Sequence, residues 1–278
     1  MRIALFANLA RTQALPLAIG IREYLESKKV EVYAEKDVAK AIHSHELKES
    51  TKINFRITLG GDGTIIRMIH RHPLIDAPVL GINHGGLGFM ADTPVKDIYT
   101  SLDALLSGSF ILQDRLMIDG AMYGENKGFA LNEIVLHRGE NLSLIEMSVN
   151  VDGLYLNTFS ADGIIVSTPN GSTAYSLASG GPILTPNLDA IVITPICPHT
   201  ISNRPIVLLP KKEIQIQYIS EYKPAQVIYD GFSHHSISTG DMISIKRSKR
   251  TFQSVLLKDH DYFSILRTKL GWSGKLKA

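Results

Sequence analysis

The pattern of apolar and polar residues changes once along the chain, near residue 108. Before that point, short apolar runs alternate with stretches whose apolar residues recur at helical spacing. The runs predict strands at 3–7, 30–33, 53–59 and 78–83, and the spacing predicts helices at 12–28, 64–70 and 94–107. Strands that alternate with helices are typical of a parallel, doubly wound sheet. We therefore expect an α/β domain over residues 1–108.

From residue 109 onward the chain becomes β-rich, and several segments alternate apolar and polar side chains as antiparallel strands do. Strands are expected at 110–119, 127–137, 143–159, 163–168, 190–195, 213–219, 225–230, 242–247 and 252–258. A final helical run from Tyr262 to Leu270 is expected to pack back on the first domain. The architecture predicted is an α/β domain with a parallel sheet, followed by a β-rich domain over residues 109–278 without a flexible spacer between them.

Composition excludes several classes of protein. Apolar residues make up 44% of the chain and charged residues 20%, as in ordinary globular domains. The formal net charge of +2 gives no global attraction to nucleic acid or to a membrane surface. A single cysteine, Cys197, excludes an intramolecular disulfide framework. With no apolar run of about 20 residues and no signal-peptide pattern, we expect a cytoplasmic protein.

The most informative stretch is a glycine loop with one aspartate, Gly60-Gly61-Asp62-Gly63-Thr64, between a predicted strand and a predicted helix. Glycine permits backbone angles and close ligand approaches that other residues do not. The free N–H groups and the positive dipole at the start of a helix attract anions. The loop matches neither the Walker motif nor the dinucleotide-binding motif. We expect a phosphate group as its ligand.

Asp62 stands where phosphate loops usually carry a lysine. Its carboxylate would repel a phosphate unless it binds a metal ion or accepts a proton from a hydroxyl that attacks phosphorus. Both alternatives indicate phosphoryl transfer. The structural alternative is a tight turn in which Asp62 caps the following helix. A second glycine loop, 84–89, follows the strand at 78–83, and because ligands bind at the carboxyl ends of parallel strands, both loops are expected to face one crevice.

The β-rich part contains two further polar motifs. Asn132 and Glu133 interrupt an apolar strand, and alternation predicts that one of them faces the buried side. An amide and a carboxylate together suit ribose hydroxyls, although an ordinary edge position would explain them too. Downstream, a turn at 168–171 is followed by Ser172 or Thr173 as the expected cap of a short helix, with Tyr175 near its exposed start. This segment suits a nucleobase, or is simply a well-capped helix.

Asp230 and Gly231 predict a hairpin turn, and His234 and His235 follow it. Adjacent strand residues point to opposite faces, so the two histidines are not expected to bind one metal ion together. We interpret them as solvated hairpin residues, with phosphate contacts as the alternative.

Taken in order, these motifs resemble the NAD kinase family from about residue 55 to the C-terminus. The resemblance rests on the loop at 60–64, Asn132-Glu133, Asp162-Gly163, the segments 167–169 and 171–176, Pro198-His199-Thr200, Arg204-Pro205 and the ending 266–272. It implies an enzyme that transfers the terminal phosphoryl group of ATP, or of inorganic polyphosphate, to the adenosine ribose 2′-hydroxyl of NAD, giving NADP. It also implies a β-sandwich-like second domain and homodimers or homotetramers.

The resemblance also implies roles for individual residues. Asp62 would be the general base, with Gly63 and Arg67 beside it in the NAD site. Asn132 and Glu133 would hold the adenosine, and Asp162 the nicotinamide end. The wall on the adenine side would be formed by Thr173, Ala174, Tyr175, Ser176, Leu177 and Ala178. A divalent cation, Mg²⁺, is expected with ATP, but the sequence names no protein ligand for it.

Two positions depart from the family pattern. Many relatives carry glutamine where this chain has Phe232, and many bacterial members carry a basic residue where it has Ser160. Two other functions compete with the family's own: a related lipid or sugar kinase that shares the loop, and a non-catalytic NAD-binding sensor. The elements suited to a nucleoside argue against the first. Asp62 argues against the second, since a pure binder gains nothing from a carboxylate beside phosphates.

Overall fold

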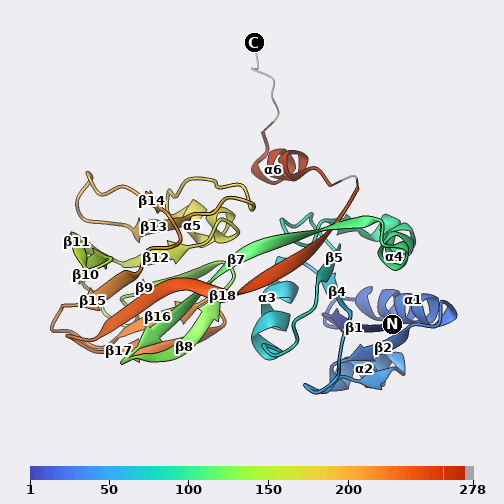
Figure 1. Cartoon of the computed structure of the whole chain (residues 1–278). Helices are drawn as coiled ribbons and strands as arrows, with labels where there is room; N and C mark the ends of the chain where they lie inside the picture. Colours follow the sequence, from blue (N-terminus) through green and yellow to red (C-terminus); the bar gives the residue numbers. More distant parts are fainter. Residues whose placement is uncertain (259, 273–278) are drawn as a thin grey trace, which may run out of the picture. The chain divides into compact units, whose positions relative to one another are not determined.

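The computed structural model describes residues 1–258 and 260–272 (Figure 1). The chain forms two compact units, one from residues 1–113 together with the described part of the chain after 252, and one from residues 114–252. We call them unit 1 and unit 2. Two long strands, β7 (Phe110–Met122) and β18 (Met242–Leu257), carry residues of both units.

Unit 1 is built on a parallel sheet in the order β3-β2-β1-β4-β5. Its strands are β1 (Arg2–Ala7), β2 (Glu31–Ala34), β3 (His45–Glu46), β4 (Phe55–Gly60) and β5 (Val79–Asn83). Short β6 (Thr93–Pro94) pairs with β5, and Ser254 of β18 pairs in parallel with Val79. The order reverses between β1 and β4, which makes the carboxyl ends of these two strands the expected ligand site.

Unit 1 also contains the helices that connect these strands and one helix near the C-terminus. They are α1 (Ala14–Ser27), α2 (Lys36–Ile42), α3 (Asp62–Arg71), α4 (Ile98–Ser107) and, near the C-terminus, α6 (Tyr262–Leu270). Right-handed crossovers place α1 and α3 on opposite faces of the sheet. Apolar residues of α1, α2 and α4 share one core with the buried sides of the strands. The predicted parallel α/β architecture of this part is confirmed.

Unit 2 is built mainly of antiparallel strands around a large apolar core, with a smaller cluster formed by Val135, Ile165 and Ile196. One sheet has the order β14-β13-β12-β9-β16-β17. Its strands are β14 (Ile206–Leu208), β13 (Ile191–Ile196), β12 (Gly163–Ser167), β9 (Glu133–His137), β16 (Ala225–Tyr229) and β17 (Ser233–Ile237). The other strands are β8 (Glu125–Ala130), β10 (Ile145–Val151), β11 (Leu154–Ala161) and β15 (Ile214–Tyr218), with the unit 2 parts of β7 and β18. Residues of both groups of strands fill the core, as in a β-sandwich.

Several predicted elements differ in extent. The strands expected at 242–247 and 252–258 are one strand, β18, because the basic run between them stays extended. The run expected at 127–137 breaks between β8 and β9, and the run at 143–159 breaks between β10 and β11. Helix α2 and strands β3, β6 and β14 were not predicted, since each is short and lacks a clear apolar repeat.

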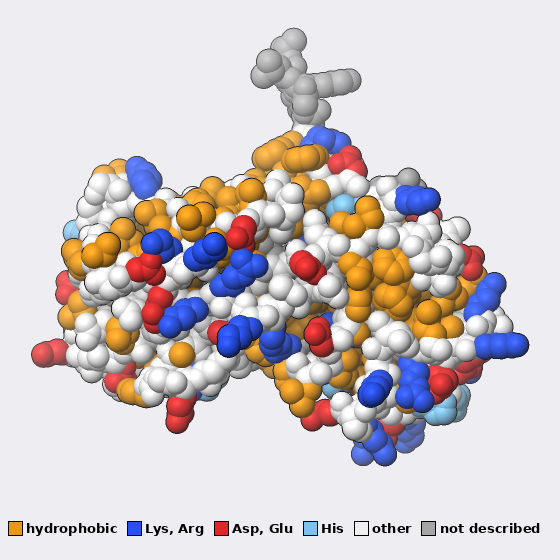
Figure 2. All heavy atoms as spheres, in the orientation of Figure 1, with side chains coloured by type: hydrophobic (Ala, Val, Ile, Leu, Met, Phe, Trp, Pro, Cys, Tyr) orange, Lys and Arg blue, Asp and Glu red, His pale blue; other side chains and the backbone are white. Residues whose placement is uncertain are grey.

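Charged side chains are mixed on the surface. On the face shown in Figure 2, basic and acidic side chains alternate with apolar ones over both units. This distribution agrees with the nearly balanced charge of the chain. None of the helices in the described part of the chain has the length and apolar character needed to cross a membrane.

Candidate active site

Asp62 is the first residue of α3, and its carboxylate is held by the second glycine loop. The backbone N–H of Phe89 donates to Oδ2 at 2.8 Å, and those of Met90 and Ala91 donate to Oδ1 at 3.0 and 2.9 Å. A carboxylate offers about four acceptor positions. Among the described residues these bonds leave Oδ2 with one donor only, so this oxygen retains an open acceptor position. These bonds bring the two glycine loops together within unit 1, and the expectation that both loops face one crevice stays a prediction.

The structural alternative, in which the carboxylate of Asp62 caps α3, is wrong. The N-cap residue of α3 is Gly61, and no side chain bonds to the N–H groups of the first turn. The loop glycines also differ from expectation, because Gly60, Gly61 and Gly63 do not have positive φ angles. Gly60 is required for space, since a Cβ there would lie 2.1 Å from Thr64 Oγ1. A Cβ at Gly61 or Gly63 would meet no atom within 4 Å, which leaves that surface open to a ligand.

The second loop fits tightly around Asp62. A Cβ on Gly88 would lie 2.2 Å from Asp62 Oδ1 and 2.8 Å from the carbonyl oxygen of Ala91. Asn83, at the end of β5, donates from Nδ2 to the carbonyl oxygens of Gly86 and Ala91 at 2.8 and 2.9 Å. The loop is therefore fastened from two sides, by the carboxylate of the first loop and by the amide of its own strand.

Arg67 lies one helical turn beyond Gly63 on α3, as predicted, and its side chain is exposed. It lines a cavity of about 360 Å³ at the carboxyl ends of β1 and β2, together with Lys36 and Arg71. Glu35 also lines this cavity, but its carboxylate is bonded to His72 at 2.9 Å and lies 3.6 Å from Arg71. Asp37 lines the cavity as well, so its wall carries both basic and acidic side chains.

Asn132 and Glu133 lie at the junction of β8 and β9 in unit 2. Glu133 is only 7% exposed, whereas Asn132 is partly exposed, so one of the two side chains is buried as predicted. The edge alternative is wrong, because β9 pairs with β12 on one side and β16 on the other. The backbone N–H groups of Leu131, Asn132 and Glu133 all donate to the carboxylate of Asp230, at 2.8, 2.8 and 3.0 Å.

The buried carboxyl group of Glu133 is electrostatically unusual. Burial, reinforced by the negative charge of Asp230, raises the pKa of Glu133 to about 8, and a bond from the backbone of Tyr175 opposes this rise. Its Oε2 has no hydrogen-bond partner among the described residues. A buried polar atom without a partner is costly, and a ligand hydroxyl would supply the missing bond.

The segment with residues 173–178 approaches this carboxyl group. Gly171–Thr173 form a 3₁₀ turn and Tyr175–Ala178 form the short helix α5. The prediction that Ser172 or Thr173 caps the helix is wrong, since its N-cap residue is Ala174 and the two hydroxyls bond to carbonyl oxygens of the preceding turn. Tyr175 is 41% exposed, as expected for a ring available to stack.

The other residues of this predicted wall differ in access. Thr173, Ala174 and Leu177 are partly exposed, and Ala178 is exposed. Ser176 is fully buried, and its hydroxyl is bonded to the hydroxyl of Thr194 at 2.9 Å. Ser176 therefore shapes the wall and does not present its hydroxyl to a ligand.

Asp162 lies directly before β12 and pairs with the guanidinium of Arg138 at 2.8 Å. A basic side chain thus stands beside this aspartate, but it does not come from position 160, which is a serine on β11. Burial raises the pKa of Tyr175, and so do the charges of Cys197, Asp162 and Glu133. Tyr175 is therefore within electrostatic range of both Asp162 and Glu133 in unit 2, whereas Asp62, Gly63 and Arg67 belong to unit 1.

Sequence reasoning missed the role of Asp230. It recognised the hairpin turn, which the structure confirms between β16 and β17, but not the bonds to residues 131–133. Asp230 has a φ angle of +51°, which is uncommon for a residue other than glycine. Its contact with Asn132 spans 98 residues of sequence, and no local pattern signals it. A second missed partner is Asn170, which donates to Asn132 Oδ1 at 2.7 Å.

Comparison with known proteins identifies the family. Residues 3–110 match the ATP-NAD kinase N-terminal domain, and residues 131–257 match the ATP-NAD kinase C-terminal domain. The chain belongs to the ATP-NAD kinase family. It is 53% identical over 277 residues to the NAD kinase of Protochlamydia amoebophila, covering 99% of both chains. It is 36% identical over 280 residues to the NAD kinase of Syntrophotalea carbinolica, covering 98% of both.

Solved structures agree in fold. A yeast NADH kinase complexed with NADH has a TM-score of 0.91, with 24% identity over 100% of this chain and 89% of the other. An NAD kinase from Archaeoglobus fulgidus in complex with ATP has a TM-score of 0.78, with 24% identity over 96% of this chain and 99% of the other. Membership of the ATP-NAD kinase family confirms the family, the two-domain fold and the enzyme class predicted from sequence. The lipid or sugar kinase and the NAD-binding sensor are not supported.

Replacing Glu133 by glutamine should remove a pH dependence of stability. The pKa of this carboxyl group rises from 4.5 in the unfolded chain to about 8 in the folded protein. Between these two pH values the folded protein therefore holds a proton that the unfolded chain has released. The free energy of unfolding therefore falls as pH rises through this window. The amide of Glu133→Gln does not ionise, so the variant does not lose stability in this way. By pH 8 its free energy of unfolding should exceed that of the native protein by an amount on the order of a few kcal/mol.

Urea unfolding of both proteins at pH 5, 6, 7 and 8 measures the difference. It should be small at pH 5 and grow steadily toward pH 8. A difference that stays constant across the range would mean that Glu133 ionises normally in the folded protein.

Proposed function

We propose that the chain transfers the γ-phosphoryl group of ATP to the adenosine ribose 2′-hydroxyl of NAD, with Asp62 as the general base. The observation that carries this proposal is the fixed carboxylate of Asp62, whose Oδ2 keeps an open acceptor position beside the open backbone of Gly61 and Gly63. The ATP-NAD kinase family of the chain supports the reaction class. A pure binding site would gain nothing from such a carboxylate, because it repels phosphates.

In the proposed step, the 2′-oxygen forms a bond to the γ-phosphorus of ATP. The bond from this phosphorus to the β,γ-bridging oxygen breaks, and ADP leaves with the electron pair. The hydroxyl proton moves to Asp62 Oδ2. A carboxylate is far less basic than an alkoxide, so it accepts this proton only as the new bond to phosphorus forms. General base catalysis of this kind contributes about 10²- to 10⁴-fold.

The other candidate site residues would bind different parts of the substrates, some from unit 1 and some from unit 2. The exposed guanidinium of Arg67 would offset phosphate charge, and Gly63 would allow a phosphate to approach closely. Glu133 Oε2 would bond to a ribose hydroxyl, and Asn132 would assist it. Tyr175 would stack on the adenine, within a wall formed by Thr173, Ala174, Ser176, Leu177 and Ala178. Asp162, paired with Arg138, would lie at the nicotinamide end.

The described residues contain no group of three His, Cys, Asp or Glu side chains placed to hold a metal ion. The residues therefore do not provide a protein cage for Mg²⁺, which often binds to enzymes through substrate phosphates and water. The proposal includes Mg²⁺ only as the companion of ATP. It also includes a homodimer or homotetramer in the cytoplasm, where the free Cys197 would stay reduced.

The reaction is tested by incubating the purified protein with NAD, ATP and Mg²⁺ and following NADP with an NADP-specific dehydrogenase. Inorganic polyphosphate replaces ATP in a parallel reaction, because it is the alternative donor. NADP formation with ATP is the expected result. If NAD binds but neither donor yields NADP, the proposed activity is wrong and the chain is an NAD-binding protein only.

A further inference from the structure

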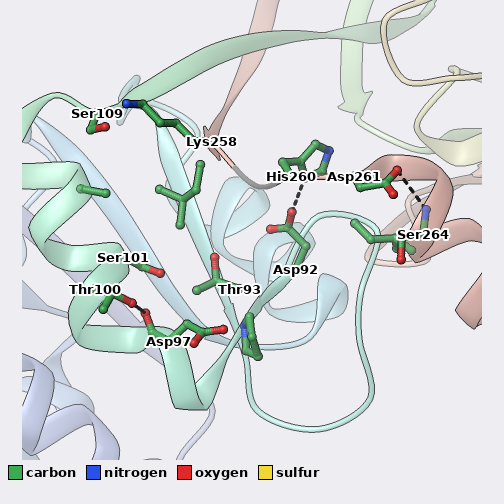
Figure 3. Close-up of a pocket in the computed structure, with 14 residues that line it drawn as sticks. Asp92, Thr93, Asp97, Thr100, Ser101, Ser109, Lys258, His260, Asp261 and Ser264 are labelled. Atoms are coloured by element: carbon green, nitrogen blue, oxygen red, sulfur yellow. Dashed lines mark hydrogen bonds and ion pairs between the residues drawn. The ribbon is translucent and has the colours of Figure 1, made fainter.

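The segment that ends in helix α6 is fastened to the loop that holds Asp62. The imidazole Nδ1 of His260, two residues before α6, is 2.5 Å from Oδ2 of Asp92. Asp92 follows directly after Ala91, one of the three backbone donors to Asp62. Figure 3 shows the two side chains pointing toward one another, with the start of α6 beside them. Both side chains are largely buried, with exposed fractions of 13% for His260 and 16% for Asp92.

A second contact joins α6 to the same loop. The ring centroids of Phe89 and Tyr262 are 6.3 Å apart, and the ammonium group of Lys269 lies 5.9 Å from the centroid of the Phe89 ring. Phe89 itself donates to Asp62 Oδ2 through its backbone. Both ends of the donor segment 89–91 are thus held by residues of the C-terminal segment, one through a ring contact and one through the neighbouring Asp92.

A cavity lies beside the contact between His260 and Asp92. His260 and Asp92 form part of the wall of a cavity of about 650 Å³, which is also lined by residues of α4 and by Lys258. On the side of this cavity, the bond between His260 and Asp92 is therefore not enclosed by apolar packing. Without the His260–Asp92 bond, Asp92 and the adjoining donors would lose a principal anchor to α6.

We infer that His260, acting through Asp92, is a positioning residue that fixes the loop donating to Asp62, and thereby orients the base. The inference rests on the proposed role of Asp62. His260 touches no reacting atom in this account. It acts by keeping the N–H groups of Phe89, Met90 and Ala91 in place, since a carboxylate that shifts by about 1 Å can lose about 10²-fold in rate.

The test uses His260→Ala, which removes the bond, and His260→Asn, whose side-chain amide can replace Nδ1 as the donor to Asp92. Amide hydrogen exchange of residues 89–91 reports on the loop directly, without any substrate. Tyr24→Phe is the matched control, because it removes another side-chain bond to an aspartate in unit 1, from Tyr24 to Asp103 at 2.5 Å, far from the loop in sequence.

In His260→Ala, exchange at Phe89, Met90 and Ala91 should accelerate about tenfold, and kcat for NADP formation should fall about tenfold with KM for NAD and ATP changed less than about twofold. His260→Asn and Tyr24→Phe should match the native protein in both measurements. Unchanged exchange in His260→Ala overturns the inference, and so does a similar loss in Tyr24→Phe. Full activity of Asp62→Asn would instead contradict the proposed role of Asp62 as the base. The two failures are distinguishable because each is measured on a different variant.

Discussion

Replacing Asp62 by asparagine should lower kcat for NADP formation by at least about a hundredfold. The amide of asparagine is not a base, so the 2′-hydroxyl would keep its proton while its oxygen attacks phosphorus. Oδ1 of the asparagine can still accept from Met90 and Ala91, as the carboxylate does. KM for NAD should therefore change much less than kcat. Initial rates measured with the coupled NADP assay, at several NAD concentrations, give both constants.

This substitution also has a structural effect that must be separated from the chemical one. The asparagine Nδ2 would face the N–H of Phe89, which now donates to Oδ2 at 2.8 Å, so one of the three bonds is lost. Amide exchange at residues 89–91 measures the disturbance, and His260→Ala provides a variant with a loosened loop and an intact carboxylate. If Asp62→Asn is no slower than His260→Ala, the loss comes from loop position and Asp62 is not the base. Equal kcat values for Asp62→Asn and the native protein would remove Asp62 from the reaction.

The second large effect is expected from Gly88→Ala, which should lower kcat by about 10²-fold. The added Cβ would lie 2.2 Å from Asp62 Oδ1 and 2.8 Å from the carbonyl oxygen of Ala91. The Ala91 oxygen belongs to the backbone and Asp62 Oδ1 is held by two backbone N–H groups, so either the loop or the carboxylate must move. The melting temperature should fall by a few degrees only, because a single loop is displaced. Steady-state kinetics together with thermal unfolding measure the two effects.

Gly86→Ala is the matched control in the same loop. A Cβ at Gly86 would meet no atom within 4 Å, and the residue is exposed with a φ angle outside the positive range. Gly86→Ala should therefore retain nearly native kcat and melting temperature. A Gly88→Ala protein as active as Gly86→Ala would show that close packing around Asp62 is not needed for catalysis.

Much of the fold was predictable because local patterns determine it. In unit 1 the buried strands have continuous apolar runs, and the connecting helix α1 has apolar residues at helical spacing. Strand β17 was recognised only as the hairpin partner that carries His234 and His235, because it has few apolar residues; His234 is exposed and His235 is partly buried. Nε2 of His235 lies 3.0 Å from the carbonyl oxygen of Lys127, a contact that spans 108 residues.

The sequence was sufficient to predict candidate site residues, but not the hydrogen bonds that hold them in place. The sequence identifies Asp62 as chemically unusual, since a carboxylate in a phosphate loop needs an explanation. It does not reveal that donors 27 to 29 residues away hold this carboxylate, because hydrogen bonds between loops leave no periodic signal. The same holds for Asp230, which fixes the backbone at Glu133 from 97 residues away. The burial that raises the pKa of Glu133 also depends on tertiary packing.

The most direct test is a crystal structure of the protein with NAD and an unreactive ATP analogue. The account predicts that Asp62 Oδ2 lies about 2.6–3.2 Å from the 2′-oxygen of the adenosine ribose. It also predicts that the N–H groups of Phe89, Met90 and Ala91 still donate to the same carboxylate. A 2′-oxygen beyond reach of Asp62, either directly or through one water molecule, or a carboxylate turned toward the 3′-hydroxyl, would contradict its role as the base.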